Sequence, residues 1–490
     1  MSTTTIFSEP LLSFRYDQKL FDPHDGLSLF GPHDTDMSSH PKNIIYGVIG
    51  TPSGIREFAN WSKIINFPIY PNLKNQKLWP LFPGFREALD STWPETPAFQ
   101  FEIDEAELIK ASHQRDPNQR AFDVVQKYID GISLIEKKDE AFHVLVCVVP
   151  DEVWLNCRPL SSVSDGWGES VPLSVRKDRA AGQTSISGAW DIETYKLSVD
   201  FRRQIKARTM KYGVPIQIVR ESTLTDERKV TPLSDRAWNL CTTLFYKAGG
   251  KPWKLASARE GVCYVGISFR KTNAEMASKT ACCAAQMFLD SGDGVVFLGD
   301  EGPWYSEKDD QFHLSSIAAK NLLKGVLATY EQLEGKKLTE IFLHARSDIS
   351  ADEFSGYQEA CPIGVKLVGI RVRADKSMRL FRLGKYPVMR GTFLKASPRT
   401  GFLWTSGFKP SLNSYDGWEV PVPLRIDIQH GEASIVQVSK DILGLTKLNY
   451  NSCKFGDSQP VTIGFSNAVG EILVSNPSVK ERSPRFKFYI

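Results

Sequence analysis

The chain has 490 residues, of which 41% are hydrophobic and 24% are charged, and its formal net charge is +3. These are ordinary values for a globular protein, and this length predicts about two or three domains. The sequence contains no apolar run of about 18 residues, which argues against a transmembrane helix, and its opening residues lack the basic head and apolar core of a signal peptide. The eight cysteines show no paired CxxC spacing, so we expect reduced thiols, no structural zinc site and a cytoplasmic protein.

Positive charge is concentrated in two zones of the chain. Residues 201–259 contain thirteen lysines and arginines against four acids, and residues 366–399 contain ten against one. Because the net charge is only +3, the remainder of the chain must be acidic. Such polarisation favours a positive channel that attracts one polyanion while the acidic body resists non-specific binding.

The opening segment, residues 1–40, is rich in turns and prolines. This composition predicts a loop or a belt that crosses the surface of another part of the protein. Histidines in such a segment are mostly polar surface residues, so we expect no ligand role for His24 or His33.

The next hundred residues predict an α/β architecture. The apolar run from Asn43 predicts a buried strand that leads into a helix, but it lacks the glycine pattern of dinucleotide-binding proteins. A helix over 118–137 and a buried strand over 142–150 follow. Strands and helices that alternate in this way form an open parallel sheet with helices on both faces. The polar, glycine-containing run over 151–191 predicts a loop insertion.

The first basic zone has a regular pattern of elements. Residues 201–212 predict a basic amphipathic helix that places Arg202 and Lys206 on one face and ends at Gly213. A strand over 216–219 should carry Gln217 outward. A second helix is predicted from an N-cap at Asp235 to Lys247, before Gly249 and Gly250.

Four side chains of this zone are expected to converge: Arg202, Lys206, Gln217 and Lys247. Three cations and one amide donor suit a terminal phosphate, because charge-assisted hydrogen bonds to phosphate oxygens are short and strong. The alternative interpretation of the charges is a solvated helix face, which is the usual behaviour of a charge run.

The same residues resemble the guide-binding MID domain of Argonaute proteins. The resemblance lies in Arg202-x3-Lys206, in the GVPIQ sequence that ends at Gln217 and in WNLCTTLFYKAGGKPW. In that family, residues at these positions bind the 5′-phosphate of a small guide strand. The resemblance therefore implies this role for Arg202, Lys206, Gln217 and Lys247, whereas Thr243 stands where many relatives have another lysine.

The second half of the chain resembles the PIWI domain, an RNase H-like fold. The resemblance lies in the strand VCYVGISF, the helix SSIAAKNLLKGVLATYEQLEG, the strand LTEIFLHARS and the ending QPVTIGFSNAVGEILV to RFKFYI. It implies an α/β chain with an N-terminal extension over 1–40, a Rossmann-like MID domain over 41–252 and a PIWI domain over 253–490.

The positions that would hold catalytic metal ions carry no acids. Family members that cleave their target have an acid at the end of the first of these strands and another in the second, and this chain has Ser268 and Ala345 there. Neither side chain suits a divalent cation, so we expect a PIWI domain without cleavage activity. An autonomous nuclease that uses other acids, such as Asp293, Asp300 and Asp348, is the rival hypothesis.

Two further sets of residues complete the predicted site. The second basic zone predicts a nucleic-acid channel, for which the candidates are Arg371, Arg373, Arg382, Lys385 and Arg390. In the resembling family the C-terminal carboxylate helps to bind a Mg²⁺ that bridges guide phosphates. The resemblance therefore implies that the carboxylate of Ile490 is a ligand of such an ion.

The resemblance is to short prokaryotic Argonautes that consist of MID and PIWI domains alone. It implies a sensor that binds a 5′-phosphorylated guide RNA, pairs it with target single-stranded DNA and activates a partner subunit. That partner would carry an analog-of-PAZ domain and a TIR or sirtuin-like NADase that depletes NAD and halts the infected cell, with assembly into a higher oligomer. The alternatives are a nuclease as the partner, or a nucleic-acid binder without sequence preference, whose affinity would not depend on a 5′-phosphate.

Overall fold

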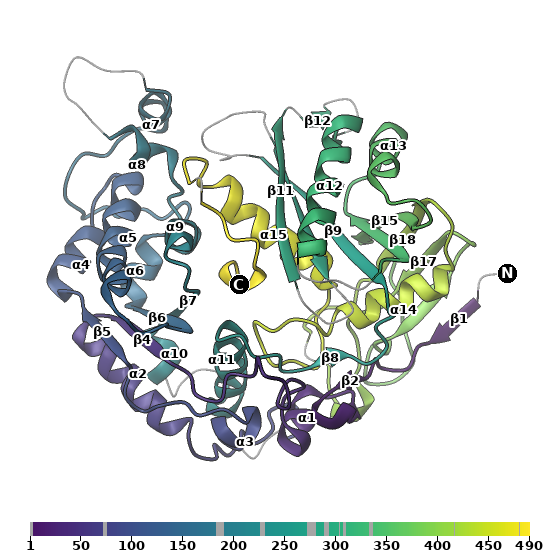
Figure 1. Ribbon diagram of the computed structural model, residues 1–490, viewed down its shortest axis with the longest axis horizontal. Helices are drawn as coiled ribbons and strands as arrows, with labels where there is room; N and C mark the ends of the chain where they lie inside the picture. Colours follow the sequence, from purple (N-terminus) through teal and green to yellow (C-terminus); the bar gives the residue numbers. More distant parts are fainter. Residues whose placement is uncertain are drawn as a thin grey trace.

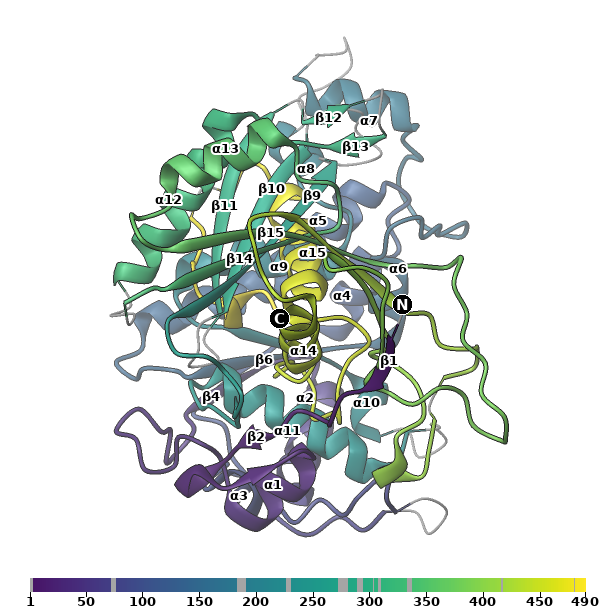
Figure 2. The ribbon, with the colours of Figure 1, turned by 90° about the vertical axis from the view of Figure 1, so that its right-hand side faces the viewer.

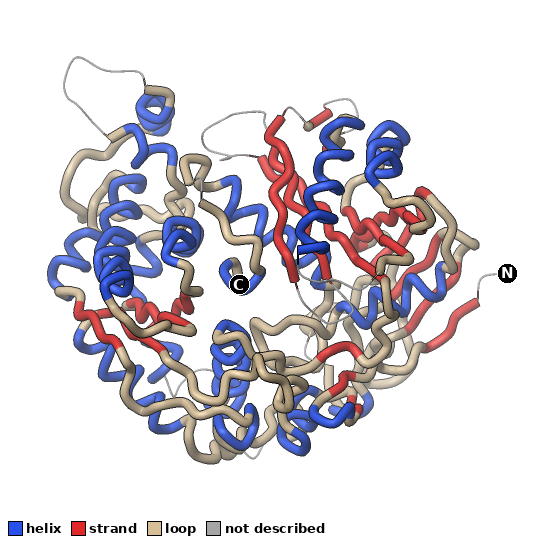
Figure 3. The backbone as a smooth tube through the Cα atoms, viewed as in Figure 1, coloured by secondary structure: helices blue, strands red, loops and turns tan. Residues whose placement is uncertain are grey.

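The computed structural model shows an α/β protein with two principal sheets, which stand on the two sides of the C-terminus (Figures 1 and 3). It describes residues 3–490 except 72–75, 183–190, 226–230, 272–280, 289–293, 303, 307–309, 333–336, 416 and 480. Within the described residues, every helix is too short or too polar to span a lipid bilayer.

The smaller sheet has four parallel strands in the order β5-β4-β6-β7. The strands are β5 (Phe99–Glu102), β4 (Tyr46–Gly50), β6 (Val144–Val149) and β7 (Ile216–Arg220). All residues of β4 and β6 are buried, as expected for central strands that helices cover on both faces. The predicted open parallel sheet is therefore confirmed.

Helices connect these strands and supply the basic elements of the sequence. They are α2 (Pro52–Ile64), α3 (Phe85–Leu89), α4 (Glu105–Ser112), α5 (Pro117–Ser133), α8 (Ile192–Lys196), α9 (Phe201–Thr209), α10 (Glu221–Thr225) and α11 (Leu233–Lys247). Helix α11 begins two residues before the predicted N-cap Asp235, because Pro232 occupies the N-cap position and the helix continues from there.

The larger sheet is mixed and has nine strands. In spatial order they are β1 (Thr3–Ile6), β16 (Thr392–Lys395), β17 (Thr400–Leu403), β18 (Leu424–His430), β15 (Lys366–Ala374), β14 (Glu340–Ala345), β9 (Val262–Lys271), β10 (Ala281–Phe288) and β11 (Gly294–Gly302). Strands β9, β14 and β15 are mutually parallel, and the other pairings are antiparallel.

Helices cover this sheet according to the alternation of its side chains. Val265 and Ile267 of β9 belong to a core cluster with α12 (Ser316–Gln332) and α13 (Ala351–Ala360). Gly266, between them, lies against α15 (Val461–Val474) so closely that a Cβ atom there would be 1.8 Å from the main-chain oxygen of Thr462. Helix α14 (Ile435–Leu445) packs near β16, β17 and β18. Large helices thus cover both faces of the central strands (Figure 1).

The N-terminal segment joins the two halves and is more regular than predicted. Strand β1 is an edge strand of the large sheet, and β2 (Leu12–Ser13) pairs with both β3 (Lys19–Leu20) and β8 (Lys254–Leu255). Helix α1 (Pro23–Phe30) follows, with Asp22 as its N-cap. The expected surface position of His24 is wrong, because its ring is buried and its Nδ1 lies 2.9 Å from Oδ1 of Asp22.

The expectation of a plain loop over 151–191 is also corrected. Two helices occupy part of it, α6 (Asp151–Asn156) and α7 (Leu173–Ala180). Acids in the first turn of α6 and basic residues in the last turn of α7 match the helix dipole, a signal that composition alone obscured.

One apolar core runs through both halves of the molecule. It includes Trp61 and Trp238 beside the smaller sheet, Trp253 in the connection, and Ile370 and Ile442 beside the larger sheet. The chain then ends in a 3₁₀ turn, Phe486–Phe488, which lies centrally between the two sheets (Figure 1). This common core fixes the frame in which the basic elements of the first half meet the end of the chain.

Candidate nucleic-acid interface

Helix α9 is positioned by its cap and by its apolar side chains. Asp200 is the N-cap, and its Oδ1 accepts a hydrogen bond of 3.0 Å from the main-chain nitrogen of Arg203. Phe201 and Ile205 are fully buried in the core around β6 and β7. This packing fixes the rotation of the helix, so that Arg202 and Lys206 lie together on another side.

Three cations meet at the end of the chain. Lys206 of α9 and Lys247 of α11 both donate hydrogen bonds to the main-chain oxygen of Ile490. Lys247 also donates to the main-chain oxygen of Ile216, over 2.7 Å, and Arg202 donates to that of Tyr489, over 3.3 Å. The structure therefore brings together Arg202, Lys206, Lys247 and Ile490, although they are separated by up to 288 positions in the numbering of the chain.

The electrostatics of this cluster are unusual. Lys206 is 3% exposed and Lys247 is 0% exposed, and no carboxylate side chain of the described residues forms an ion pair with Arg202, Lys206 or Lys247. Burial lowers the pKa of Lys247 to about 7, and the positive charge of Arg202 also lowers it. The pKa of Lys206 lies well below its ordinary value, mainly because the side chain is buried and also because Lys247 and Arg202 place positive charge beside it. The terminal carboxylate of Ile490 carries one negative charge against three cations, so a further anion in this position would balance the remaining positive charge.

The two other predicted residues are engaged differently. Nε2 of Gln217 donates to the main-chain oxygen of the adjacent Ile218 at 3.0 Å. Thr243 stands one turn before Lys247, but it is buried, and its hydroxyl donates to the main-chain oxygen of Asn239 at 2.8 Å. Neither side chain donates a hydrogen bond to Ile490, so the cation cluster consists of Arg202, Lys206 and Lys247.

The chain end is held by contacts that the sequence did not indicate. Phe486, Phe488 and Tyr489 pack in a cluster with residues of α9 and α15. Asn476, which follows α15, accepts a hydrogen bond from the main chain of Ser198 and donates to that of Arg203. Asn476 thereby ties α9 to the segment that leads to Ile490. Its only signal in the sequence was an isolated polar residue after an apolar helix.

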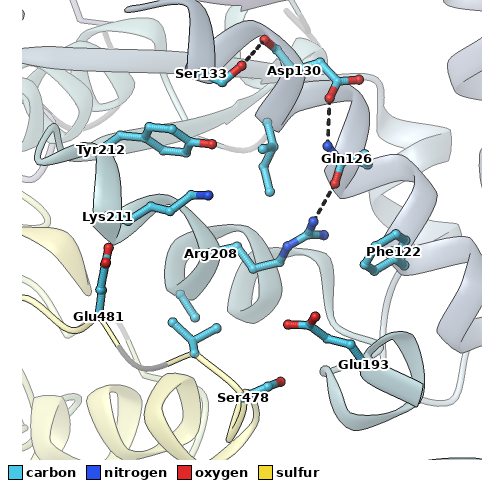
Figure 4. A pocket seen from close by; sticks show the side chains of 13 residues that line it. Phe122, Gln126, Asp130, Ser133, Glu193, Arg208, Lys211, Tyr212, Ser478 and Glu481 are labelled. Atoms are coloured by element: carbon cyan, nitrogen blue, oxygen red, sulfur yellow. Dashed lines mark hydrogen bonds between the residues drawn. The ribbon is translucent and has the colours of Figure 1, made fainter. Parts of the chain in front are cut away.

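A separate cavity of about 510 Å³ lies between α5, α9 and the side chains of Ser478, Val479 and Glu481 (Figure 4). Arg208 extends into it, stacks over the ring of Phe122 at 4.5 Å and donates to Oε1 of Gln126 at 2.5 Å. The acids Glu193 and Glu481 also line this cavity. Its mixed charge and the absence of Arg202, Lys206 and Lys247 from its lining distinguish it from the cation cluster.

The two positions expected to lack metal ligands are buried on opposite faces of the large sheet: Ser268 packs against α15, and Ala345 lies in the core cluster with α12 and α13. Ser268 is buried, and its hydroxyl donates to the main-chain oxygen of Ser466 at 2.8 Å. Ala345 is 2% exposed. Nδ1 of the neighbouring His344 lies 2.9 Å from Oγ1 of Thr462, and burial lowers the pKa of this histidine to about 3. Within the described part of the chain, no group of three or more acidic, histidine or cysteine side chains is arranged to hold a metal ion.

The acids of the rival nuclease hypothesis are only partly described. Asp348 is engaged, because its Oδ1 accepts from Arg371 and Gln429 and its Oδ2 accepts from Gln311. Asp293 lies outside the described residues, and so does the side chain of Asp300. Asp348, the one acid of the three whose side chain the structure describes, is thus a member of a hydrogen-bonded network.

The predicted channel residues divide into two groups. Arg373, Arg382 and Lys385 are exposed. Arg371 pairs with Asp348 and Asp427 and its side chain is 12% exposed, whereas Arg390 is buried and pairs with Glu9 at 3.0 Å. The channel role predicted for Arg390 is therefore corrected: its guanidinium neutralises an internal carboxylate. Arg371 is likewise paired within the protein: Asp427 lies on the neighbouring strand β18, and Asp348 lies shortly after β14.

The arrangement of the two sheets is that of the MID and PIWI parts of Argonaute structures. Clostridium butyricum Argonaute bound to a guide DNA with a 5′ deoxycytidine and to a 19-mer target DNA matches with a TM-score of 0.64 and 13% sequence identity, over 100% of this chain and 55% of that chain. The crystal structure of Aa-Ago with externally bound siRNA matches with a TM-score of 0.57 and 14% identity, over 99% and 55%. The predicted fold class is confirmed.

Sequence comparison agrees with the structural comparison. Protein argonaute of Aquifex aeolicus (strain VF5) is 23% identical over 287 residues, which are 58% of this chain and 37% of that protein. No protein-family model matches the chain. By its sequence and structural neighbours, the chain is Argonaute-like, and it spans about half the length of the solved Argonaute chains that it matches.

Proposed function

We propose that this chain binds the 5′-phosphorylated end of a small guide RNA and presents the guide for pairing with target single-stranded DNA. One observation carries the proposal: Lys206 and Lys247 are buried, both donate to the terminal oxygen of Ile490, and neither forms an ion pair with a carboxylate side chain of the described residues. Charges of one sign are costly to bury together. A terminal phosphate removes that cost and accepts several hydrogen bonds.

Mg²⁺ fits this site as a ligand shared with the guide. The ion prefers oxygen ligands and usually combines one or two protein carboxylates with phosphate oxygens. The described site offers the terminal oxygen of Ile490 among three cations, which is too little to hold the ion without an added anion. Residues Lys206, Lys247 and Arg202 would bind and orient the phosphate, and the ion would neutralise the charge between phosphate groups when bound.

The proposal also includes a sensor role without target cleavage. Ser268 and Ala345 offer no carboxylate to a catalytic metal ion, and α15 packs directly against Ser268. The resemblance stated above supports a partner subunit with an analog-of-PAZ domain and NADase activity, in a prokaryotic immune response. A nuclease partner is the alternative that the same resemblance offers.

The decisive experiment compares matched oligonucleotides that differ only at the 5′ end. The affinity for a 5′-phosphorylated RNA and for its 5′-hydroxyl counterpart is measured with the wild-type chain, with Lys206→Ala/Lys247→Ala and with Lys211→Ala. Lys211 is an exposed lysine directly after α9 and serves as the control. We expect the double variant to lose the preference for the phosphate and the control to keep it.

Two results would contradict the proposal. The first is a wild-type chain that binds both RNAs equally, which is the behaviour of a binder that contacts only the backbone. The second is a double variant that discriminates as well as the wild type does. Incubation of the loaded chain with target DNA and Mg²⁺ or Mn²⁺ tests the absence of cleavage, since any guided cut would support the nuclease hypothesis.

A further inference from the structure

Two neighbouring loops at the end of the large sheet carry exposed apolar side chains among exposed cations. The first loop covers residues 375–387, between β15 and β16, and the second covers residues 413–423. They are joined because the main-chain nitrogen of Asp375 donates to the oxygen of Pro423 at 2.9 Å and the hydroxyl of Tyr386 donates to the oxygen of Asn413 at 3.3 Å. Green loops from this part of the chain project from the body in Figure 2.

The inner side of these loops is anchored. Met378 and Leu380 pack against a small apolar cluster that contains Trp404. Tyr386 stacks on Phe408, with their ring centroids 4.3 Å apart. Because these contacts fix which side chains face inward, the outward side chains form a defined surface.

The outward side consists of apolar and basic residues together. Phe381 is 75% exposed, Leu383 is 98% exposed and Trp418 is 103% exposed relative to the reference value for its residue type. The exposed cations of the first loop include Arg379, Arg382 and Lys385. These six side chains are named the basic–aromatic surface: Arg379, Phe381, Arg382, Leu383, Lys385 and Trp418.

The charge of this surface is not neutralised by the described residues around it. None of Arg379, Arg382 and Lys385 forms an ion pair with a described carboxylate; Arg379 donates to main-chain oxygens of its own loop, and Arg382 lies over the ring of Phe408 at 5.6 Å. Two of the three exposed apolar side chains are aromatic rings with open faces. Cations beside open rings are the combination that binds the backbone and the bases of a single strand.

One side of the surface lies near the end of β14. Trp418 lines a cavity of about 460 Å³ together with Ala374 and Gln459. Oε1 of Gln459 accepts a hydrogen bond of 2.8 Å from Arg346, which directly follows Ala345. A strand that passes the exposed side chain of Arg346, just after β14, would therefore reach Trp418 within the same neighbourhood.

We propose that the basic–aromatic surface binds single-stranded nucleic acid, by stacking unpaired bases on Phe381 and Trp418 while Arg379, Arg382 and Lys385 contact phosphates. The source of the strand, an unpaired part of the guide or of the target, rests on the proposed function. The binding of a single strand by this surface does not. Base faces within a duplex are covered by their neighbours, so stacking selects a single strand. Stacking is tolerant of sequence, in keeping with recognition that leaves the sequence to base pairing.

The test uses a fluorescent single-stranded DNA of about 20 nucleotides with a 5′-hydroxyl, so that the strand offers no 5′-phosphate to the cation cluster at Ile490. Its affinity is measured at several salt concentrations for the wild type, for Phe381→Ala/Trp418→Ala and for Arg379→Ala/Arg382→Ala/Lys385→Ala. The controls are Tyr70→Ala, which removes a ring that is 79% exposed elsewhere, and Lys63→Ala/Lys196→Ala/Lys324→Ala, which removes three exposed lysines.

We expect the ring variant to bind the single strand at least about tenfold more weakly, because each stacked base contributes strongly, and to keep the salt dependence of the wild type. The cation variant should lower the slope of log affinity against log salt by about 2, since each lost phosphate contact removes roughly 0.7. A blunt duplex should bind the ring variant as tightly as it binds the wild type. Both control variants should behave as the wild type does.

The proposal is overturned if the ring variant keeps its affinity for the single strand, or if it loses affinity for the duplex to the same extent. A ring variant that keeps single-strand affinity but loses a co-purifying protein would assign the surface to a protein partner. These results are independent of the phosphate site, because preference for a 5′-phosphate is measured with the other oligonucleotide pair and the Lys206→Ala/Lys247→Ala variant.

Discussion

Two regions of this molecule bury cations, and they treat the charge in opposite ways. In the first, Arg390 and Lys447 surround the carboxylate of Glu9, with distances of 3.0 Å from each cation. In the second, Lys206 and Lys247 both donate to the terminal oxygen of Ile490, with Arg202 beside them and no acidic side chain as a partner among the described residues. Buried charge that is balanced inside the protein leaves no place for a ligand, whereas an excess of buried positive charge favours an anion from outside.

The pKa values express the same difference. Burial alone would raise the pKa of Glu9, but Arg390 and Lys447 hold it below its ordinary value. Burial lowers the pKa of Lys447 only to about 8, because Glu9 opposes the effect. At the other site burial lowers the pKa of Lys247 to about 7, and Arg202 adds to the effect.

The largest expected effect is at the neutralised site. Glu9→Gln leaves Arg390 and Lys447 buried without their carboxylate, which should lower the free energy of unfolding by about 3–5 kcal/mol. Chemical denaturation of the wild type and of the variant measures it. Glu140→Gln, at an exposed position without a predicted role, is the control and should change stability by less than about 0.5 kcal/mol. If Glu9→Gln is equally harmless, Glu9 is not the counter-ion of this region.

The next effect concerns Lys206. Lys206→Met should reduce the preference for a 5′-phosphate by about 10-fold to 100-fold, because it removes a hydrogen bond to a charged group. The same change should leave the free protein as stable as the wild type or more stable by about 1–2 kcal/mol, since an unneutralised buried amine is removed. Binding and unfolding measurements on one preparation test both. A variant that unfolds more easily would indicate that Lys206 has a structural role like that of Arg390.

The third prediction is a dependence on pH. In the free protein Lys247 loses its proton near pH 7, while a bound phosphate favours the charged amine, so binding should take up a proton above that pH. The affinity for a 5′-phosphate should therefore fall by up to about tenfold per pH unit from pH 7 to pH 9. Calorimetric titration in two buffers with different ionisation enthalpies measures the proton uptake. An affinity that does not change over this range would contradict the assignment.

The stability of the free protein should change in the opposite direction. The unfolded chain binds a proton at Lys247 up to an ordinary pKa of 10.5, whereas the folded chain has lost it near pH 7. Between these values the unfolded state binds more protons, so the contribution of Lys247 to stability becomes more favourable as the pH rises. Comparison of the wild type with Lys247→Met across this window isolates that contribution.

The smallest expected effect is at Lys487. Its Nζ donates to the main-chain oxygen of Lys247 at 3.1 Å, and its charge contributes to the lowered pKa of the Lys247 side chain. Lys487→Ala should raise that pKa slightly and change the affinity for a 5′-phosphate at neutral pH by less than about twofold. A pH titration of affinity is the measurement, and a loss comparable to that of Lys206→Met would add Lys487 to the cation cluster.

The sequence predicted those features that depend on local pattern. Apolar runs indicated the buried strands β4 and β6, and the four-residue spacing of Arg202 and Lys206 placed both on one side of α9. The open parallel sheet of the first half followed from this alternation, whereas the RNase H-like fold of the second half was implied by the resemblance. The convergence of Lys206 with Lys247 could be predicted for the same reason, because Lys206 lies on the helix before β7 in the chain and Lys247 on the long helix after it.

Features that depend on distant partners were not predictable in this way. Arg390 appeared to be one more cation of a basic zone, because its partner Glu9 is 381 positions away. His24 appeared to be a surface residue until α1 packed its ring against Trp238, at 5.2 Å between ring centroids. The side chain of Gln217 was expected to reach the site, yet it hydrogen-bonds to its own strand. A charge pattern indicates how many cations a region has, and only the tertiary structure shows which of them are already paired.

The close packing of α15 on β9 restricts what can replace Ser268. A carboxylate introduced as Ser268→Asp would face the main-chain oxygen of Ser466, which now accepts the serine hydroxyl, and two acceptors repel each other. This repulsion cannot be relieved while α15 stays in place, because the helix already packs closely on β9, with Thr462 directly against Gly266. With this packing, the single substitution Ser268→Asp would not be enough to create a metal site, because α15 would have to shift as well.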